Sequence, residues 1–204
     1  MEKFSCMEKT KHFYYLCFMA IALLSCKSEY QQYVERELAS GVVQDSLIFD
    51  MRIGQTKKDF YAICWELNKQ QVITAGTGNK TARYTADVDT LGDNTQAKDM
   101  LFYGVFDEED VMQGMEMTYA YIAWAPWNRD KHADSLLYRL RDQYLAGYPG
   151  NDFIQIDVNI KGKEFPALVK IDGNRQILMY PKDNKKDVVV RIEDLRYKLK
   201  RSLE

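Results

Sequence analysis

The stretch "FPALVKIDGNRQILMY", residues 165–180, holds two apolar runs separated by Asp172-Gly173-Asn174. Glycine flanked by aspartate and asparagine is typical of the tight turns that join two antiparallel strands. The runs on either side have the composition of strands. We therefore predict a hairpin in which residues 165–171 pair with residues 176–180.

Segments of the same kind recur on both sides of this hairpin, with glycine-containing or polar turns between them. They predict further strands at 46–53, 71–74, 81–87, 100–106, 112–124, 153–160 and 188–192. Residues 100–106 are apolar on both faces, as expected of a central strand that is covered on both sides.

Four segments carry helix signals, at 28–39, 56–68, 130–146 and 193–203. Ser28 and Gln31 predict a capping box at the start of the first helix. Thr56 is the expected cap of the second helix, with Asp59 three residues later. Lys and Arg stand late in the last segment, where they complement the helix dipole.

Strands outnumber helices in this pattern, which predicts an α+β fold with a mostly antiparallel sheet and helices packed on it. No low-complexity linker interrupts residues 46–204, so we expect them to form a single domain. An alternative divides the domain into two similar halves, 46–124 and 125–204, each a helix with four strands. Sequence similarity between the halves is not visible.

The first 25 residues have the three parts of a secretory signal peptide. Lysines lie before residue 13, residues 13–24 carry no charge, and Ser25 precedes Cys26. A membrane-spanning helix needs roughly 20 apolar residues, and this run is shorter. Residues 1–25 are therefore expected to be a signal peptide, and a start at Met7 in place of Met1 would give a cleaner basic segment.

Leu23, Leu24, Ser25 and Cys26 resemble the lipobox of bacterial lipoproteins, position by position. The resemblance implies that Cys26 begins the mature chain and carries the lipid. Two or three acyl chains hold a protein firmly, since each buried methylene contributes about 0.8 kcal/mol. An ordinary signal peptide with a chance cysteine, or a short anchor that is never cut, are the alternatives.

If Cys26 is lipidated, residues 26–45 form a short helical tether to the membrane. No aspartate follows Cys26 directly, which favours the outer membrane over retention at the inner membrane. Whether the chain would face the periplasm or the cell surface is left open.

Charge and cysteine content exclude some classes of function. Residues 1–26 hold three of the 28 Lys and Arg and two of the 30 Asp and Glu, which leaves a net charge of −3. A nearly balanced chain gives no electrostatic reason to expect nucleic acid as a partner. Cys6 and Cys17 leave with the signal peptide and Cys26 carries lipid, so Cys64 cannot form an internal disulfide. Cys64 lies on an apolar helical stripe and is expected to be a buried, inert thiol.

No motif for a catalytic, metal or cofactor site stands out. His132 is the one histidine of the mature chain, and its neighbours on a helix start cannot form a Ser-His-Asp triad with it. Residues 87–98 place lysine where a calcium loop needs glutamate. The acidic run 107–110 is expected to be a solvated loop, and Gly76-Thr77-Gly78 lacks the third glycine of a dinucleotide site. We therefore expect no cofactor and no metal.

The densest aromatic stretch is "YAYIAWAPWNRD", residues 119–130. It connects the strand predicted at 112–124 to the helix predicted at 130–146. Aromatic faces beside an amide and a guanidinium suit sugars or other flat ligands. The candidate ligand-binding residues are Tyr121, Trp124, Trp127, Asn128 and Arg129. Trp127 is the better candidate for exposure. A core aromatic cluster and a protein-binding patch are the alternatives.

Residues 53–60, "IGQTKKDF", resemble the helix-opening segment of BamE/SmpA-type small outer-membrane lipoproteins. In layout the chain is also similar to uncharacterised lipoproteins of Bacteroidetes-type bacteria, a resemblance that implies no activity. We expect a lipid-anchored, non-enzymatic cell-envelope protein that binds a protein partner or supports an envelope complex. A glycan or small-ligand binding lipoprotein is the first alternative, and a carboxylate-based hydrolase is the second.

Overall fold

The computed structural model describes residues 28–87, 96–160 and 162–197. It has two units, residues 1–33 and 34–204. Helix α2 (Glu29–Ala39) begins in the described part of the first unit. The Gln31 amide donates to Ser28 Oγ at 3.2 Å, and the Ser28 amide donates to Gln31 Oε1 at 3.0 Å. The predicted capping box is confirmed.

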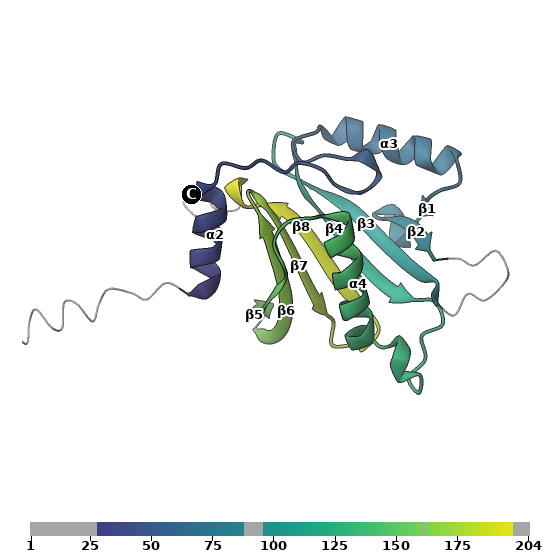
Figure 1. Cartoon of the computed structure of the whole chain (residues 1–204). Helices are drawn as coiled ribbons and strands as arrows, with labels where there is room; N and C mark the ends of the chain where they lie inside the picture. The colour runs from purple at the N-terminus through teal and green to yellow at the C-terminus, as the bar shows by residue number, and fades with distance from the viewer. Residues whose placement is uncertain (1–27, 88–95, 161, 198–204) are drawn as a thin grey trace, which may run out of the picture. The chain divides into compact units, whose positions relative to one another are not determined.

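The second unit is built on one antiparallel sheet, and the predicted α+β class is confirmed (Figure 1). The strands of the described chain are β1 (Thr74–Ala75), β2 (Ala82–Ala86), β3 (Lys98–Phe106), β4 (Met112–Tyr121), β5 (Ile154–Ile160), β6 (Lys163–Asp172), β7 (Arg175–Pro181) and β8 (Val188–Asp194). Their order across the sheet is β1-β2-β3-β4-β8-β7-β6-β5.

The hairpin predicted from residues 165–180 is β6 and β7, joined by Gly173 and Asn174. Asp172 pairs with Arg175 across the turn. Gly173 adopts φ 58°, and a Cβ built on it would lie 2.1 Å from the Val42 carbonyl oxygen. Glycine is therefore required here both by the backbone conformation and by the neighbouring segment.

The strand order is symmetric about the central pair of strands, β4 and β8. A helix followed by a four-strand meander makes each side of the sheet: α3 (Lys57–Lys69) with β1–β4, and α4 (Ala133–Gly147) with β5–β8. This is the order that two similar halves would produce. Met117 of β4 pairs with Val190 of β8, so the sheet is continuous across the two sides.

Helices α3 and α4 contribute to one hydrophobic core on one face of the sheet (Figure 1). Phe60 of α3 and Leu136 and Leu140 of α4 are buried there. The hydroxyls of Tyr119 and Tyr144 lie 2.9 Å apart within this core, which satisfies two buried polar groups. No helix in the described part of the chain is long and apolar enough to cross a membrane.

The prediction of a strand at 46–53 is wrong. A short 3₁₀ helix, η1 (Ile48–Asp50), interrupts this segment, and Phe49 and Asp50 have φ of 56° and 59°. The alternating apolar residues still reach the core, since Leu47 and Met51 are buried. They do so from a compact loop in which the Leu47 amide donates to the Met51 carbonyl at 2.9 Å.

Other predicted boundaries differ from the structure. Glu193 and Asp194 belong to β8, and the closing helix begins at Leu195, with residues 198–203 outside the described range. Of the strand predicted at 71–74, only Thr74 is in a strand, the two-residue β1. The strand predicted at 112–124 ends at Tyr121. Two further 3₁₀ helices are η2 (Thr77–Asn79) and η4 (Arg129–Lys131), and η4 occupies the start of the helix predicted at 130–146.

Candidate functional site

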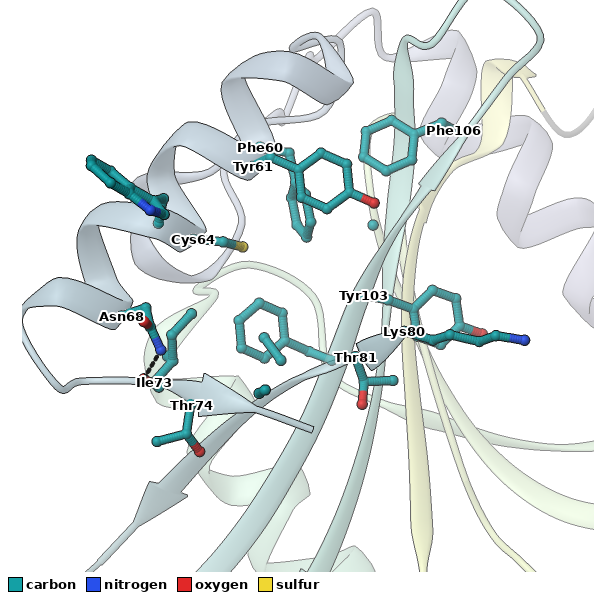
Figure 2. A pocket seen from close by; sticks show the side chains of 15 residues that line it. Phe60, Tyr61, Cys64, Asn68, Ile73, Thr74, Lys80, Thr81, Tyr103 and Phe106 are labelled. Atoms are coloured by element: carbon teal, nitrogen blue, oxygen red, sulfur yellow. Dashed lines mark hydrogen bonds between the residues drawn. The ribbon is translucent and has the colours of Figure 1, made fainter. Parts of the chain in front are cut away.

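A cleft of about 520 Å³ lies between helix α3 and strands β1–β3 (Figure 2). Volumes of 300–1,000 Å³ are typical of ligand-binding sites in proteins. Apolar and aromatic side chains form most of its lining, and the polar side chains of the lining are one lysine, two threonines and one asparagine. The cleft, which we name the α3 cleft, is therefore the candidate functional site.

Helix α3 forms one wall of the α3 cleft. Thr56 Oγ1 accepts a hydrogen bond from the Asp59 amide at 3.1 Å, and Asp59 Oδ2 accepts one from the Thr56 amide at 3.4 Å. The predicted cap therefore fixes the start of the helix. Tyr61, Cys64 and Asn68 then follow at helical spacing and line the cleft. Figure 2 shows the Cys64 sulfur pointing into it.

The far end of this wall is held by a hydrogen bond within the cleft. Asn68 Nδ2 donates to the Ile73 carbonyl at 3.0 Å, a bond drawn in Figure 2. The bond ties the last turn of α3 to the chain that leads into β1. The helix and the edge of the sheet are thus fixed relative to each other.

Strand β3 forms the floor of the α3 cleft. Phe102 is fully buried beneath it, and the ring of Phe106 meets the ring of Phe60 edge-on with centroids 5.5 Å apart. A Cβ on Gly104 would lie 2.6 Å from the Phe106 ring. Gly104 therefore leaves the space in which that ring lies.

Burial keeps two ionisable groups of the α3 cleft, Cys64 and Tyr103, neutral near pH 7. Burial raises the pKa of the Cys64 thiol to about 11. Burial, and then a hydrogen bond with Glu116, raises the pKa of Tyr103 to about 12. Lys80 is exposed, and its side chain has no hydrogen-bond or ion-pair partner among the described residues. No carboxylate or imidazole belongs to the lining in the described chain.

The thiol of Cys64 is expected to react slowly with alkylating reagents. At pH 8 a pKa of about 11, in place of 9.0, leaves about a hundredfold less thiolate, the reactive form. We expect iodoacetamide to modify Cys64 about a hundredfold more slowly in the folded chain than in urea. The rate should rise about tenfold per pH unit towards pH 11.

This expectation is checked by mass spectrometry of the peptide that contains Cys64, sampled over time at several pH values. The urea-unfolded chain provides the reference rate for the same thiol. Equal rates in the folded and unfolded chains would contradict the account of a protected thiol.

The five residues predicted to form an aromatic ligand site do not share one surface. Tyr121 is buried, 1% exposed, with Lys131 Nζ 4.6 Å from its ring centroid. Trp124 is half-buried, and its Nε1 donates to the Lys185 carbonyl at 3.2 Å. Trp127 is 85% exposed, as its position after a proline predicted.

The remaining two residues of that prediction lie at the start of the 3₁₀ helix η4. Asn128 is half-buried and its carbonyl accepts from the Lys131 amide at 3.1 Å. Arg129 is exposed at the start of η4. An exposed tryptophan on a loop is therefore the part of this prediction that offers a free aromatic surface.

The acidic run 107–110 forms the turn between β3 and β4. Asp107 Oδ1 accepts from the amides of Glu109 and Val111 at 3.0 Å and 2.8 Å. Asp110 pairs with Lys57 at 2.8 Å. The carboxylate of Asp107 is thus used within the turn and that of Asp110 pairs with α3. The described residues contain no cluster of His, Cys, Asp or Glu suited to a metal ion. Residues 88–95 of the calcium-loop comparison lie outside the described range.

The α3 cleft was not predicted from the sequence. The sequence pattern of α3 predicts only the face that packs on the core, whereas Tyr61 and Trp65 on the neighbouring face are 58% and 61% exposed. Two large aromatic side chains on the polar face of a helix are a signal that could have suggested a binding surface.

Comparison with known proteins identifies no relative. Searches with protein-family models, among curated proteins and among solved structures found no match to this chain. The proposal that follows is therefore built from the α3 cleft and from the sequence of the N-terminal segment.

Proposed function

We propose that this chain is a lipid-anchored cell-envelope protein that binds a partner or ligand in the α3 cleft and does not transform it. The α3 cleft is the observation that carries the proposal. Its exposed aromatic side chains and its size suit binding. The anchor is supported by the lipobox-like residues ending at Cys26.

Binding without catalysis agrees with the chemistry of the cleft lining. Hydrolysis by carboxylates needs an acid and a base near the reacting atoms, and the described lining of the α3 cleft contains no carboxylate. Cys64 is protonated near neutral pH, and a thiol in that form is a poor nucleophile. Lys80 supplies a positive charge that can hold an anionic group without reacting with it.

Labelling with palmitate tests the anchor. The wild-type chain is expected to incorporate the label and Cys26→Ala is expected to lose it, because the resemblance implies that the Cys26 thiol receives a diacylglyceryl group before its amine is acylated. The outer membrane is the expected location of the labelled protein. Equal labelling of both chains would remove the anchor from the proposal.

Site-specific photo-crosslinking in whole cells tests the α3 cleft. Replacing Tyr61 by a photoreactive phenylalanine analogue is expected to give an adduct, because its side chain is 58% exposed at the cleft. Tyr138 on α4 is a matched control, since it is also a helical tyrosine and is 52% exposed. The adducts are separated by electrophoresis and identified by mass spectrometry.

The same experiment weighs the second candidate, a glycan or small-ligand site at Trp127. The 85% exposure of Trp127 is the observation in its favour. Adducts at position 127 and none at position 61 would favour that site. Equal adducts at positions 61 and 138, or none at 61, would contradict a binding role for the α3 cleft.

A further inference from the structure

Strand β3 has an edge that β2 leaves uncovered at the α3 cleft. β2 pairs with β3 only from Lys98 to Phe102, whereas β3 pairs with β4 as far as Phe106. Residues 103–106 therefore have a neighbouring strand on one side. Three of these four residues line the cleft, so the uncovered edge opens into it (Figure 2).

The backbone groups of Gly104 and Phe106 point to this open side. The Ala97 carbonyl accepts from the Ile122 amide at 3.0 Å, on the side of β4. Backbone groups of successive residues alternate between the two sides of a strand. The irregularity in the β3–β4 register skips a residue of β4 only, so the alternation along β3 is kept. Among the described residues, β2 does not reach Gly104 or Phe106, and no loop backbone or side chain hydrogen-bonds to their amides or carbonyls.

The opposite edge of the sheet differs in a way that protects it. Within the described part of the chain, β5 also has no strand on its outer side, but the exposed residue Asp157 stands at its centre. Pairing of two copies about this residue would place two carboxylates opposite each other, which is unfavourable. Residues 103–106 contain no charged side chain. Of these two edges, the edge of β3 is the one open to another strand.

We infer that the α3 cleft takes an extended, acidic peptide segment of another protein, which pairs with Gly104 and Phe106 as an added strand. The inference rests on the proposed binding role of the cleft. Main-chain hydrogen bonds hold a peptide added in this way, and pockets for alternate side chains select its sequence. Phe60, Cys64 and Phe106 receive an apolar side chain.

The positive charge of Lys80 selects the acidic side chain of the peptide. Lys80 is exposed at the cleft and its ammonium group has no partner among the described residues, and no carboxylate of the described lining competes for it. In Figure 2 its side chain runs beside Tyr103, at the end of the cleft where β2 begins. A basic or neutral peptide would leave this charge unpaired.

Selection from a random heptapeptide library displayed on phage tests the sequence of the segment. The target is the full chain, purified in detergent. Peptides enriched on the wild-type chain are expected to carry Asp or Glu beside apolar residues. On Lys80→Glu the enriched charge is expected to become Lys or Arg. Lys58→Glu, an exposed lysine of α3 outside the cleft lining, is the matched control and should keep the acidic preference.

Methylation of the peptide backbone tests strand pairing. Methyl groups on one set of alternate amides should raise the Kd at least about tenfold, because hydrogen bonds to β3 are lost. Methylation of the other set should change it less than about threefold. Equal tolerance of both sets, or no enriched peptide, would overturn the inference.

These outcomes are separable from the test of the binding role itself. Adducts at position 61 in cells together with no enriched peptide would remove the added strand and keep the binding role. No adducts at position 61 would remove the role, and a peptide selected in vitro could not restore it.

Discussion

Asp172→Ala is expected to destabilise the fold by about 3–5 kcal/mol, the cost typical of breaking a buried ion pair from one side. The Asp172 side chain is 8% exposed, and its Oδ1 accepts from Lys170 Nζ at 3.0 Å. Its Oδ2 lies 3.6 Å from Arg175 Nη2. Lys170 and Arg175 are 0% and 2% exposed. Removal of the carboxylate leaves both cations in the interior, and Lys170 has no other carboxylate partner among the described residues.

The effect is expected to be global because this ion cluster joins three parts of the chain. The Asn151 amide, just beyond α4, donates to Asp172 Oδ1 at 2.8 Å. Arg175 lies over the ring of Tyr148 at 4.6 Å and donates to Ser46 Oγ at 3.1 Å. The cluster therefore ties the end of α4 and the loop before α3 to the β6–β7 hairpin.

Urea unfolding followed by circular dichroism measures the loss. Asp183→Ala is the matched control, since Asp183 pairs with Lys163 but both side chains are more than half exposed. Exposed pairs contribute about 0–1 kcal/mol, so this variant should remain close to wild type. Equal losses in the two variants would show that burial does not set the value of the Asp172 pair.

A second variant separates charge from packing at this cluster. Lys170→Met removes one buried cation and leaves Asp172 facing Arg175. In the Asp172→Ala background it should restore part of the lost stability, with a coupling energy of about 1–3 kcal/mol. Independent, additive losses would show that the two residues contribute mainly through their volume.

Much of the fold could be predicted because its signals are local. The hairpin at Gly173 and Asn174 and the capping pair at Thr56 and Asp59 involve residues within a few positions of each other. Such interactions form wherever the rest of the chain allows them. The continuous apolar run around Val169 also has a structural reason, since β6 and β7 bury side chains on both faces of the sheet.

The errors arose where distant residues decide the local conformation. The alternation of residues 46–53 matched a strand, but the segment folds back on itself, since the Ile53 amide donates to the Asp45 carbonyl at 2.8 Å. The chain first bonds to the sheet at Gly54, whose amide donates to the Met112 carbonyl of β4. Asp194 was expected inside a helix. It remains in β8 because Asn174 Nδ2 donates to its carboxylate at 2.7 Å across the neighbouring hairpin.

The α3 cleft could not be predicted for the same reason. It exists because α3 packs over β3, about 40 residues later in the sequence, and because β2 ends before β3 does. The sequence shows strands and helices but not the register at which strands stop pairing. The aromatic composition of residues 119–130 predicted a ligand site there, yet Tyr121 is buried in the core.

Gly114→Ala is expected to destabilise the fold by about 3 kcal/mol, and Gly104→Ala by about 1 kcal/mol, although both place one methyl group in a strand. A Cβ on Gly114 would lie 2.2 Å from the Ile192 carbonyl oxygen and 2.9 Å from Glu193 Cα, both backbone atoms of β8. A Cβ on Gly104 would meet the ring of Phe106, which can rotate or shift. Relief at Gly114 requires β4 and β8 to separate, and their pairing joins the two sides of the sheet.

Thermal unfolding of the two variants compares a steric clash with backbone atoms and a steric clash with a side chain, for the same glycine-to-alanine substitution. A loss of 1 kcal/mol shifts the Tm of a domain of this size by about 2–4 °C, so Gly114→Ala should melt about 6–12 °C below wild type. Gly104→Ala should lose a third of that, and its displaced Phe106 ring should also weaken binding in the α3 cleft. A smaller loss for Gly114→Ala than for Gly104→Ala would show that the β4–β8 pair is not the rigid centre of the sheet.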